Sequence, residues 1–218
     1  MKVVALIPIK LNNERMPGKN LKSFENGRPL LSYILETALK VDSIDELYVY
    51  CSSETIVDYL PAKVRFLKRP AWLDLSSTSM TDVITSFIEA VEADIYVLLH
   101  ATAPFISAKS IEDGINALKE KGHDSAIAVR RHYEFLWRDG KPDNYDVFNI
   151  PRTQDLEPYF TETTGMYVFA KELAKRGLRI GLHPHLIEVC EIEAVDINEP
   201  IDFKIANAIY NYILSSGR

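Results

Sequence analysis

Apolar residues recur along this chain in two patterns, short uninterrupted runs and longer segments with a helical period. The runs, such as residues 3–9 and 95–100, are rich in β-branched and aromatic residues, which favours strands buried on both faces. The segments between them repeat their apolar positions every three or four residues, which indicates amphipathic helices. The predicted strands are 3–9, 46–51, 63–67, 95–100, 125–129 and 166–169, and the predicted helices are 29–39, 80–92 and 107–121.

Strands that alternate with helices predict βαβ units and a parallel sheet. We therefore expect an α/β fold of the Rossmann-like kind, a three-layer, doubly wound, mostly parallel sheet within a single domain over residues 1–218. Right-handed connections then bring the carboxyl ends of the strands to one edge. Lys10, Ser52 and Ala101 are expected together at that edge, where a ligand crevice forms.

A last helix is expected over residues 201–214. Its apolar positions repeat every four residues, which predicts a stripe packed in the core. The residues of this stripe are Ile201, Ile205, Ile209 and Ile213.

Residues 130–165 break the βαβ rhythm. Aromatic residues there alternate with prolines and an Asp139-Gly140 turn signal. A long aromatic-rich insertion predicts a lid or a dimerisation surface, although aromatic side chains pack in cores as often. The aromatic residues are Tyr133, Trp137, Tyr145, Phe148, Tyr159 and Phe160.

Composition and charge narrow the range of partners. The formal net charge of −6 argues against nonspecific nucleic-acid binding, which needs a broadly basic face. The two cysteines, Cys51 and Cys190, form no C-x-x-C pair and no disulfide framework. The first apolar run is too short for a signal peptide or a membrane span. We therefore expect a cytoplasmic protein with reduced thiols and neither a nucleic-acid nor a membrane partner.

The loop that follows the first strand carries the clearest chemical signal. It contains Lys10, Arg15 and Lys19, and Pro17-Gly18 fixes a turn within it. Three cations and a permissive backbone at a strand's carboxyl end suit a triphosphate, whose charge must be neutralised at close range. The loop matches neither G-x-x-x-x-G-K-[ST] nor G-x-G-x-x-G. A solvated charged turn is the alternative interpretation.

Five segments in one order resemble the CMP-N-acetylneuraminate synthetases, the cytidylyltransferases that activate acidic nine-carbon sugars. The first is the loop itself, with Ile7-Pro8 before it and Lys19-Asn20 at its end. The others are similar to family patterns along nearly the whole chain. Residues 68–79 resemble R-P-x-x-L…S, 98–105 resemble L-L-Q-P-T-S-P-L, 195–198 resemble I-D-I-D, and the remaining segment resembles R-Q-D-L-P-P at 153–158 and N-G-A-I-Y at 165–167.

This resemblance implies a nucleotide-diphospho-sugar transferase-like fold and a reaction. CTP and a 2-keto-3-deoxy sugar acid, similar to sialic acid, give the CMP-sugar and pyrophosphate in a Mg²⁺-dependent homodimer, with 130–165 as a dimerisation or lid insertion. The anomeric hydroxyl attacks the α-phosphorus in line, so positioning and charge neutralisation are the main tasks of the protein. The Arg-x-Pro-Gly-Lys ending of the loop is closer to the 3-deoxy-manno-octulosonate cytidylyltransferases.

Carried over residue by residue, the resemblance assigns expected roles. The catalytic residues are Lys10, Lys19 and Asp196. The nucleotide-binding residues are Lys10, Arg15, Lys19, Asn20, Arg69, Thr78 and Ser79. The sugar-binding residues are His100, Thr102, Gln154 and Tyr159, and the metal ligands are Asp196 and Asn198 at alternate positions of a strand end. Arg152, in competition with Arg130 and Arg131, is expected to pair with the sugar carboxylate.

Departures from the family pattern leave alternatives open. Asn198 replaces the second aspartate of D-x-D, which removes a charge from the metal site, and His100 replaces a glutamine. A strand-end histidine satisfied by the backbone is the structural interpretation of His100. A nucleotidyltransferase for a sugar or polyol phosphate is one alternative function. A catalytically weakened nucleotide-binding protein is the other.

Overall fold

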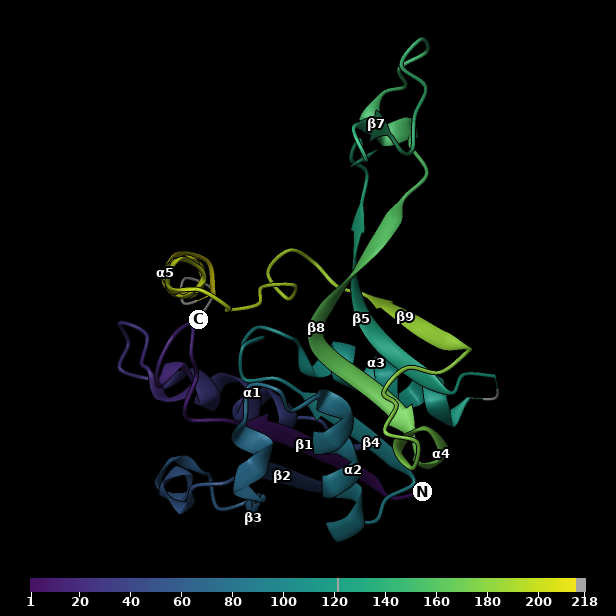
Figure 1. The fold of residues 1–218 in the computed structure, drawn as a ribbon. Helices are drawn as coiled ribbons and strands as arrows, with labels where there is room; N and C mark the ends of the chain where they lie inside the picture. The colour runs from purple at the N-terminus through teal and green to yellow at the C-terminus, as the bar shows by residue number, and fades with distance from the viewer. Residues whose placement is uncertain (121, 215–218) are drawn as a thin grey trace.

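A computed structural model of the chain describes residues 1–120 and 122–214. One seven-stranded sheet has the order β3-β2-β1-β4-β8-β5-β9, and helices cover both of its faces (Figure 1). The strands are β1 (Val3–Ile9), β2 (Glu46–Cys51), β3 (Val64–Lys68), β4 (Ile95–Leu99), β5 (Ser125–His132), β6 (Trp137–Arg138), β7 (Lys141–Pro142), β8 (Tyr159–Ala170) and β9 (Pro184–Glu188). The helices are α1 (Leu30–Ala38), α2 (Met80–Ala90), α3 (Ala108–Lys119), α4 (Lys171–Ala174) and α5 (Pro200–Ile209), with short 3₁₀ turns at Lys19–Leu21, Glu54–Tyr59, Ala71–Asp74 and Thr153–Asp155 and a π turn at Tyr210–Leu214.

The predicted three-layer, mostly parallel α/β fold is confirmed. Each of the six predicted strands and three predicted helices is present, with ends that differ by a few residues except in β5 and β8. Both of these strands are longer than predicted, and β9 was not predicted at all. Ser107 caps α3, because its Oγ accepts a hydrogen bond from the Ser110 amide, 3.1 Å away. Lys121, the expected end of this helix, lies outside the described residues.

β8 is the exception to the parallel arrangement. It runs antiparallel between β4 and β5, so that Tyr167 lies beside both Leu98 and Ile127. The first half of the chain supplies the parallel order β3-β2-β1-β4. β1 connects through α1 to β2, and β4 connects through α3 to β5, so the two connections run toward opposite edges of the sheet. A crevice is expected between the carboxyl ends of two such strands.

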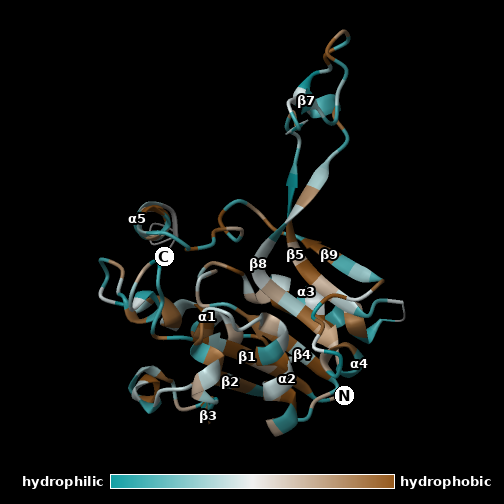
Figure 2. Ribbon diagram, viewed as in Figure 1, coloured by the Kyte–Doolittle hydropathy of each residue, from teal (hydrophilic) through white to brown (hydrophobic). Residues whose placement is uncertain are grey.

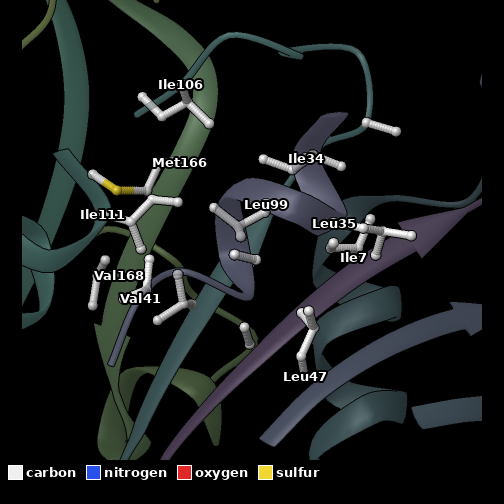
Figure 3. Packing of buried hydrophobic residues seen from close by; sticks show 14 of the residues in the cluster. Ile7, Ile34, Leu35, Val41, Leu47, Leu99, Ile106, Ile111, Met166 and Val168 are labelled. Carbon is white, nitrogen blue, oxygen red and sulfur yellow. The ribbon is translucent and has the colours of Figure 1, made fainter. Parts of the chain in front are cut away.

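Side chains on the two faces of the sheet form separate apolar layers. One layer packs against α1 and α3 and includes Ile7, Leu99 and Met166 (Figure 3). The opposite layer packs against α2 and includes Leu98 and Tyr167. Because β1, β4 and β8 are apolar on both faces, burial fixes the register of the central strands.

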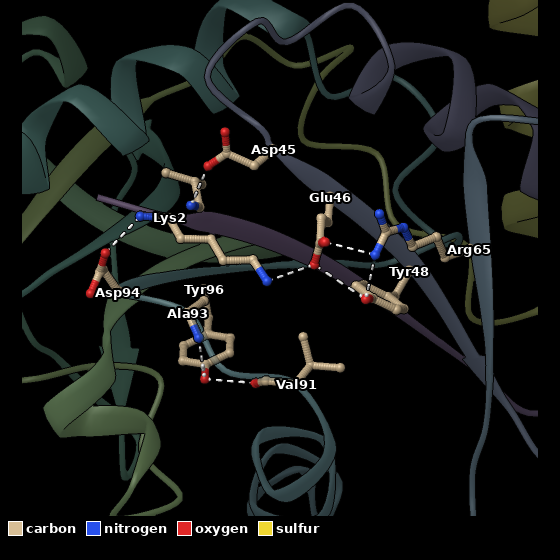
Figure 4. A network of polar contacts seen from close by, with 10 residues as sticks. Lys2, Asp45, Glu46, Tyr48, Arg65, Val91, Ala93, Asp94 and Tyr96 are labelled. Atoms are coloured by element: carbon tan, nitrogen blue, oxygen red, sulfur yellow. Dashed lines mark hydrogen bonds and ion pairs between the residues drawn. The ribbon is translucent and has the colours of Figure 1, made fainter.

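The amino ends of the strands are held by polar contacts (Figure 4). The Lys2 amide donates to Asp94 over 2.6 Å, and the Val3 amide donates to Asp45 over 2.7 Å. The Lys2 ammonium pairs with Glu46 at 2.8 Å. These contacts fasten the edge of the sheet opposite the crevice.

The expected isoleucine stripe of α5 is wrong. Ile201 and Ile205 are 58% and 50% exposed, and the side chain of Ile213 lies outside the described residues. α5 instead buries Phe203, Ala206 and Tyr210 in a third apolar cluster. Each four-residue step turns 40° around a helix, so the isoleucine stripe starts on the face opposite the two aromatic rings and approaches them only at Ile209, which is partly buried against this cluster. Those rings bury more apolar surface and set the orientation of the helix.

Residues 133–158 form an extension that projects far beyond the rest of the molecule on the paired ends of β5 and β8 (Figure 1). A small hairpin, β6 and β7, turns at Asp139 and Gly140, both with positive φ. The extension shows hydrophobic colour at its tip (Figure 2). Its most exposed apolar side chains are Trp137 (62%), Phe148 (96%) and Ile150 (63%). In the described part of the chain, no helix is both long enough and apolar enough to cross a bilayer.

Candidate functional site

The loop after β1 opens at the crevice. Gly18 has φ 68°, a left-handed conformation that suits glycine and starts the 3₁₀ turn at Lys19. The loop surrounds a cavity of about 220 Å³. The structure thus brings the three predicted cations to one hollow; its lining residues are Lys10, Asn13, Glu14, Arg15, Met16, Lys19 and Ser76.

Lys19 is the buried cation of this loop. Its side chain crosses to the segment before α5, where Nζ donates to the carbonyl oxygen of Ile197 over 2.8 Å. Burial lowers the pKa of the Lys19 ammonium, and this outweighs the nearby carboxylate of Asp196, which raises it. A desolvated ammonium is a strong partner for phosphate oxygens, because little water competes for it.

The segment that carries Asp196 is irregular, so its expected position at a strand end is wrong. Residues 195–198 lie between β9 and α5 without pairing in the sheet. The peptide of Ile197 holds the segment instead, since its amide donates to the Thr102 carbonyl over 2.8 Å and its carbonyl accepts from Lys19. Thr102, an expected sugar contact, thereby fastens the segment that presents Asp196.

Asp196 has one oxygen satisfied and one free. Its Oδ2 accepts from the Thr164 hydroxyl at 3.1 Å and from the Asn198 amide at 2.8 Å. Its Oδ1 is buried and has no hydrogen-bond partner among the residues that the structure describes. A buried carboxylate oxygen without a partner is costly, so this atom indicates a place for a ligand.

Thr164 is a site residue that the sequence analysis missed. Its φ is 55°, which is strained for a β-branched residue. In this conformation its hydroxyl reaches Asp196 and its carbonyl contacts Nδ1 of His100. Thr164 stands where the N-G-A-I-Y pattern has asparagine, a residue that tolerates left-handed backbone. The threonine in place of asparagine was the feature of the sequence that could have drawn attention to Thr164.

His100 ends β4 with its ring partly buried. Nδ1 contacts the Thr164 carbonyl, as the structural interpretation predicted, and the ring lies 6.2 Å from that of Tyr167 between centroids. Burial lowers the pKa of His100 below its ordinary 6.5, and this outweighs the hydrogen bond to the Thr164 carbonyl, which raises it. The imidazole is therefore neutral at pH 7.

The free energy of unfolding is expected to fall as pH drops through 6.5 because of His100. The unfolded chain takes up a proton near pH 6.5, whereas the folded ring resists it until a lower pH, so acid favours unfolding. His100→Gln should flatten this dependence between pH 7 and 5, measured by urea unfolding. The exposed His183 offers the control His183→Gln, and equal slopes for wild type and both variants would contradict the assignment.

Arg69 is buried rather than solvated. Its Nε donates to Asp74 at 3.0 Å, and Nη2 contacts the same oxygen. The Thr78 hydroxyl donates to the Trp72 carbonyl at 3.0 Å, and the Ser79 side chain caps α2 together with Asp82. These residues lie in the segment from β3 to α2, of which Ser76 lines the cavity, and their expected contact with cytosine remains a prediction.

The remaining nucleotide and metal residues join the same hollow. The Asn20 side chain donates to the Lys10 carbonyl at 3.0 Å and thereby shapes the loop. Arg15 donates from Nη2 to Oδ1 of Asn198 at 2.9 Å. The side-chain amide of Asn198, which stands where the family pattern has aspartate, thus connects the loop to Asp196 through two hydrogen bonds.

Gln154 and Tyr159 do not meet the crevice of their own chain. Gln154 lies in the projecting extension, and the Tyr159 hydroxyl donates to Glu134 at its base. The three arginines expected to compete for a sugar carboxylate already face acidic residues. Arg152 pairs with Asp155, Arg131 with Glu188 and Arg130 with Glu191.

The donor set fits Mg²⁺ in part. Oδ1 of Asp196 is the free anionic ligand, while the amide oxygen of Asn198 would have to exchange Arg15 for the metal. Among residues 1–120 and 122–214, no group of three or more His, Cys, Asp or Glu side chains is placed to hold a metal ion. This suits Mg²⁺, which commonly takes one or two carboxylates and completes its shell with water and phosphate oxygens.

Comparisons with solved structures show the same fold. A CMP:2-keto-3-deoxy-manno-octonic acid synthetase complexed with CTP superposes with a TM-score of 0.72 at 17% identity, covering 97% of this chain and 99% of that one. A 4-diphosphocytidyl-2C-methyl-D-erythritol synthase from Anaerococcus prevotii gives a TM-score of 0.69 at 15% identity, covering 96% and 98%.

Curated proteins match along most of the sequence. N-acylneuraminate cytidylyltransferase A of Danio rerio is 26% identical over 94% of this chain and 50% of its own length, so this chain spans about half of that relative. The CMP-N,N'-diacetyllegionaminic acid synthase of Legionella pneumophila is 25% identical over 96% of both chains. The 3-deoxy-manno-octulosonate cytidylyltransferase of Escherichia coli is 23% identical over 87% of this chain and 74% of its own. The cytidylyltransferase family profile matches residues 4–178, and the chain belongs to that family.

Proposed function

We propose that this protein transfers a cytidylyl group from CTP to a 2-keto-3-deoxy sugar acid of the nonulosonate type and releases pyrophosphate. The observation that carries this proposal is the free, buried Oδ1 of Asp196 on the segment that Lys19 and Thr102 hold at the crevice. The relatives named for N-acylneuraminate and diacetyllegionaminic acid support the acceptor class.

In this reaction the protein mainly positions the two substrates and neutralises the charge of the triphosphate. The anomeric hydroxyl of the acid attacks the α-phosphorus, and the bond to pyrophosphate breaks on the opposite side. Lys10, Arg15 and Lys19 line the cavity that would receive the triphosphate, where they neutralise its charge. Asp196, with Asn198 beside it, would hold Mg²⁺, which when bound neutralises phosphate oxygens and templates the attack.

In this proposal, the segment that carries Arg69, Thr78 and Ser79 recognises cytosine. Their side chains are engaged within the protein, and the amides of Thr78 and Ser79 donate to Leu75 and Asp82. This proposal therefore assigns the base to backbone groups of Ser76 and Ser77, which precede them. Fixed backbone groups suit the reading of one base, because a mismatched base would leave them unpaired.

We further propose a homodimer assembled through the extension. Its exposed apolar side chains, among them Phe148 at 96%, are costly in water, and the extension carries Gln154 away from the crevice of its own chain. A second copy is therefore the proposed occupant of this surface. Light scattering should give twice the 24.8 kDa chain mass, whereas Phe148→Asp combined with Ile150→Asp should give monomers. A monomeric wild type would contradict this arrangement.

The direct test is pyrophosphate release from CTP, UTP, ATP or GTP with Mg²⁺ against sialic, legionaminic, pseudaminic and octulosonic acids and a set of sugar phosphates. Turnover is expected with CTP and a nonulosonate. Turnover only with a phosphorylated acceptor would move the assignment to another nucleotidyltransferase. A cytoplasmic location belongs to the proposal, since both cysteines are free thiols and CTP is a cytoplasmic nucleotide.

A weakened catalyst is the second candidate, favoured by one contact. Arg15 binds the Asn198 oxygen that would otherwise face a metal, so the site has one carboxylate and a cation in place of a second ligand. CTP binding by calorimetry, without pyrophosphate release in excess Mg²⁺ or Mn²⁺, would support this candidate over the enzyme.

A further inference from the structure

One arginine on the α2 face of the sheet has no role in the reaction described above. Arg179 is half-buried in the loop between α4 and β9, and its guanidinium lies over the ring of Tyr167, 4.1 Å from the centroid. In contrast to Arg130, Arg131 and Arg152, it takes part in no ion pair between described residues. Its five N–H groups therefore remain available to a ligand.

The loop that carries Arg179 is fixed rather than loose. Gly177 has φ 68°, and a Cβ at this position would lie 2.5 Å from the side chain of Thr81 in the first turn of α2. Only glycine fits both conditions, so the loop packs closely against that helix. The loop and helix enclose a cavity of about 270 Å³, lined by Met80, Thr81, Ile84, Gly177, Leu178, Arg179 and Ile180.

A chain of contacts connects Arg179 to the reacting centre. The Tyr167 ring lies between the guanidinium and the ring of His100, whose centroid is 6.2 Å from that of Tyr167. His100 in turn contacts Thr164, which binds Asp196. Arg179 thus lies on the α2 face of the sheet, and the rings of Tyr167 and His100 connect it to the proposed metal carboxylate.

Glu162, the neighbouring acidic residue, does not pair with Arg179. It accepts a hydrogen bond from the Tyr167 hydroxyl at 2.9 Å, and burial raises the pKa of that tyrosine to about 12. Tyr167 therefore stays protonated and holds Glu162 in place. The flat ring supports one face of the guanidinium and leaves its edge free to donate hydrogen bonds.

We propose that Arg179 recognises the end of the acceptor remote from the reacting hydroxyl, by donating to the amide oxygen of an N-acylamino group. This inference rests on the proposed function, which places the anomeric hydroxyl beside Lys19 and Asp196 and so directs the far end of the sugar past His100 toward Arg179. An N-acylated nonulosonate offers an amide oxygen there, whereas 3-deoxy-octulosonate offers only hydroxyls. Arg179 thereby selects the nine-carbon, N-acylated class.

The test compares two acids and three variants in the pyrophosphate assay. Wild type should use an N-acylated nonulosonate with at least about 10-fold higher kcat/KM than 3-deoxy-octulosonate, the range expected for one charged hydrogen bond. Arg179→Met keeps the apolar stem on Tyr167 and should lower kcat/KM for the nonulosonate by about the same factor, with little change for octulosonate or in the KM for CTP. Arg179→Lys should lie between the two, since it keeps the charge without the planar fork.

Arg176→Met is the matched control, because Arg176 is exposed on the same loop. It should behave as wild type, and thermal unfolding should show that all variants fold. A wild-type preference that survives Arg179→Met, or an equal loss for both acids, overturns the inference and leaves the proposed function intact. Absence of turnover by wild type with every acid overturns the proposed function, and this inference with it.

Discussion

Asp196→Ala should lower the kcat for pyrophosphate release by at least about 100-fold, as expected when a metal clamp is lost. Oδ1 of this residue is the free carboxylate oxygen at the crevice, and no second carboxylate neighbours it in the 195–198 segment. The loss should persist at every Mg²⁺ concentration, because water cannot replace the anionic ligand. Steady-state kinetics with CTP and the preferred acid measure it, and near-normal kcat would remove Asp196 from the metal site.

Asn198→Asp is the companion variant to this experiment. It places a second carboxylate next to Asp196, at the position from which Nδ2 of the native Asn198 donates to Asp196 over 2.8 Å. Repulsion between the two should lower the stability of the metal-free protein, while Mg²⁺ should bind at lower concentration. A rise in kcat would show that the native amide limits catalysis. An unchanged Mg²⁺ dependence would place Asn198 outside the metal shell and leave it as the partner of Arg15 alone.

The central strands could be predicted because the sheet is covered on both faces. β1 and β4 are buried nearly throughout, so each appears in the sequence as an uninterrupted apolar run. β9 lacks this signal, because it lies at the edge, starts with Pro184 and buries only Ile187 fully. β8 was predicted too short for a related reason, since its first four residues rise toward the extension and are exposed or only partly buried, so they form no continuous apolar run.

The cations of the candidate site could be predicted because they lie next to a strand. Lys10, Arg15 and Lys19 follow β1 directly, so strand topology alone places them at the crevice. Arg179 and Thr164 have no such local signal. The role of Arg179 depends on a loop packed against a helix about 100 residues earlier, and that of Thr164 on a strained backbone angle. Tertiary contacts decide such positions, and a single sequence does not encode them as a pattern.

Lys19 has two functions in the structure, and a variant must separate them. Its ammonium is a buried charge at the cavity, and it also donates to the Ile197 carbonyl next to Asp196. Lys19→Arg keeps a charge and several donors, whereas Lys19→Met keeps the length of the chain and removes both functions. Lys22→Met, one turn further along and exposed, is the matched control for loss of a lysine near this loop.

Lys19→Met should lower kcat by about 100-fold or more and weaken CTP binding by less than about 10-fold, because negative charge grows on the leaving pyrophosphate mainly in the transition state. Calorimetry gives the CTP affinity and the pyrophosphate assay gives kcat. Wild-type kcat should also decline at alkaline pH below the ordinary lysine range, since burial lowers the pKa of Lys19 and the charge is lost as pH rises through that lowered value. Lys19→Arg should remove the decline, because a guanidinium stays protonated there. If CTP affinity falls as much as kcat, Lys19 binds the ground-state triphosphate and the pyrophosphate leaves without its help.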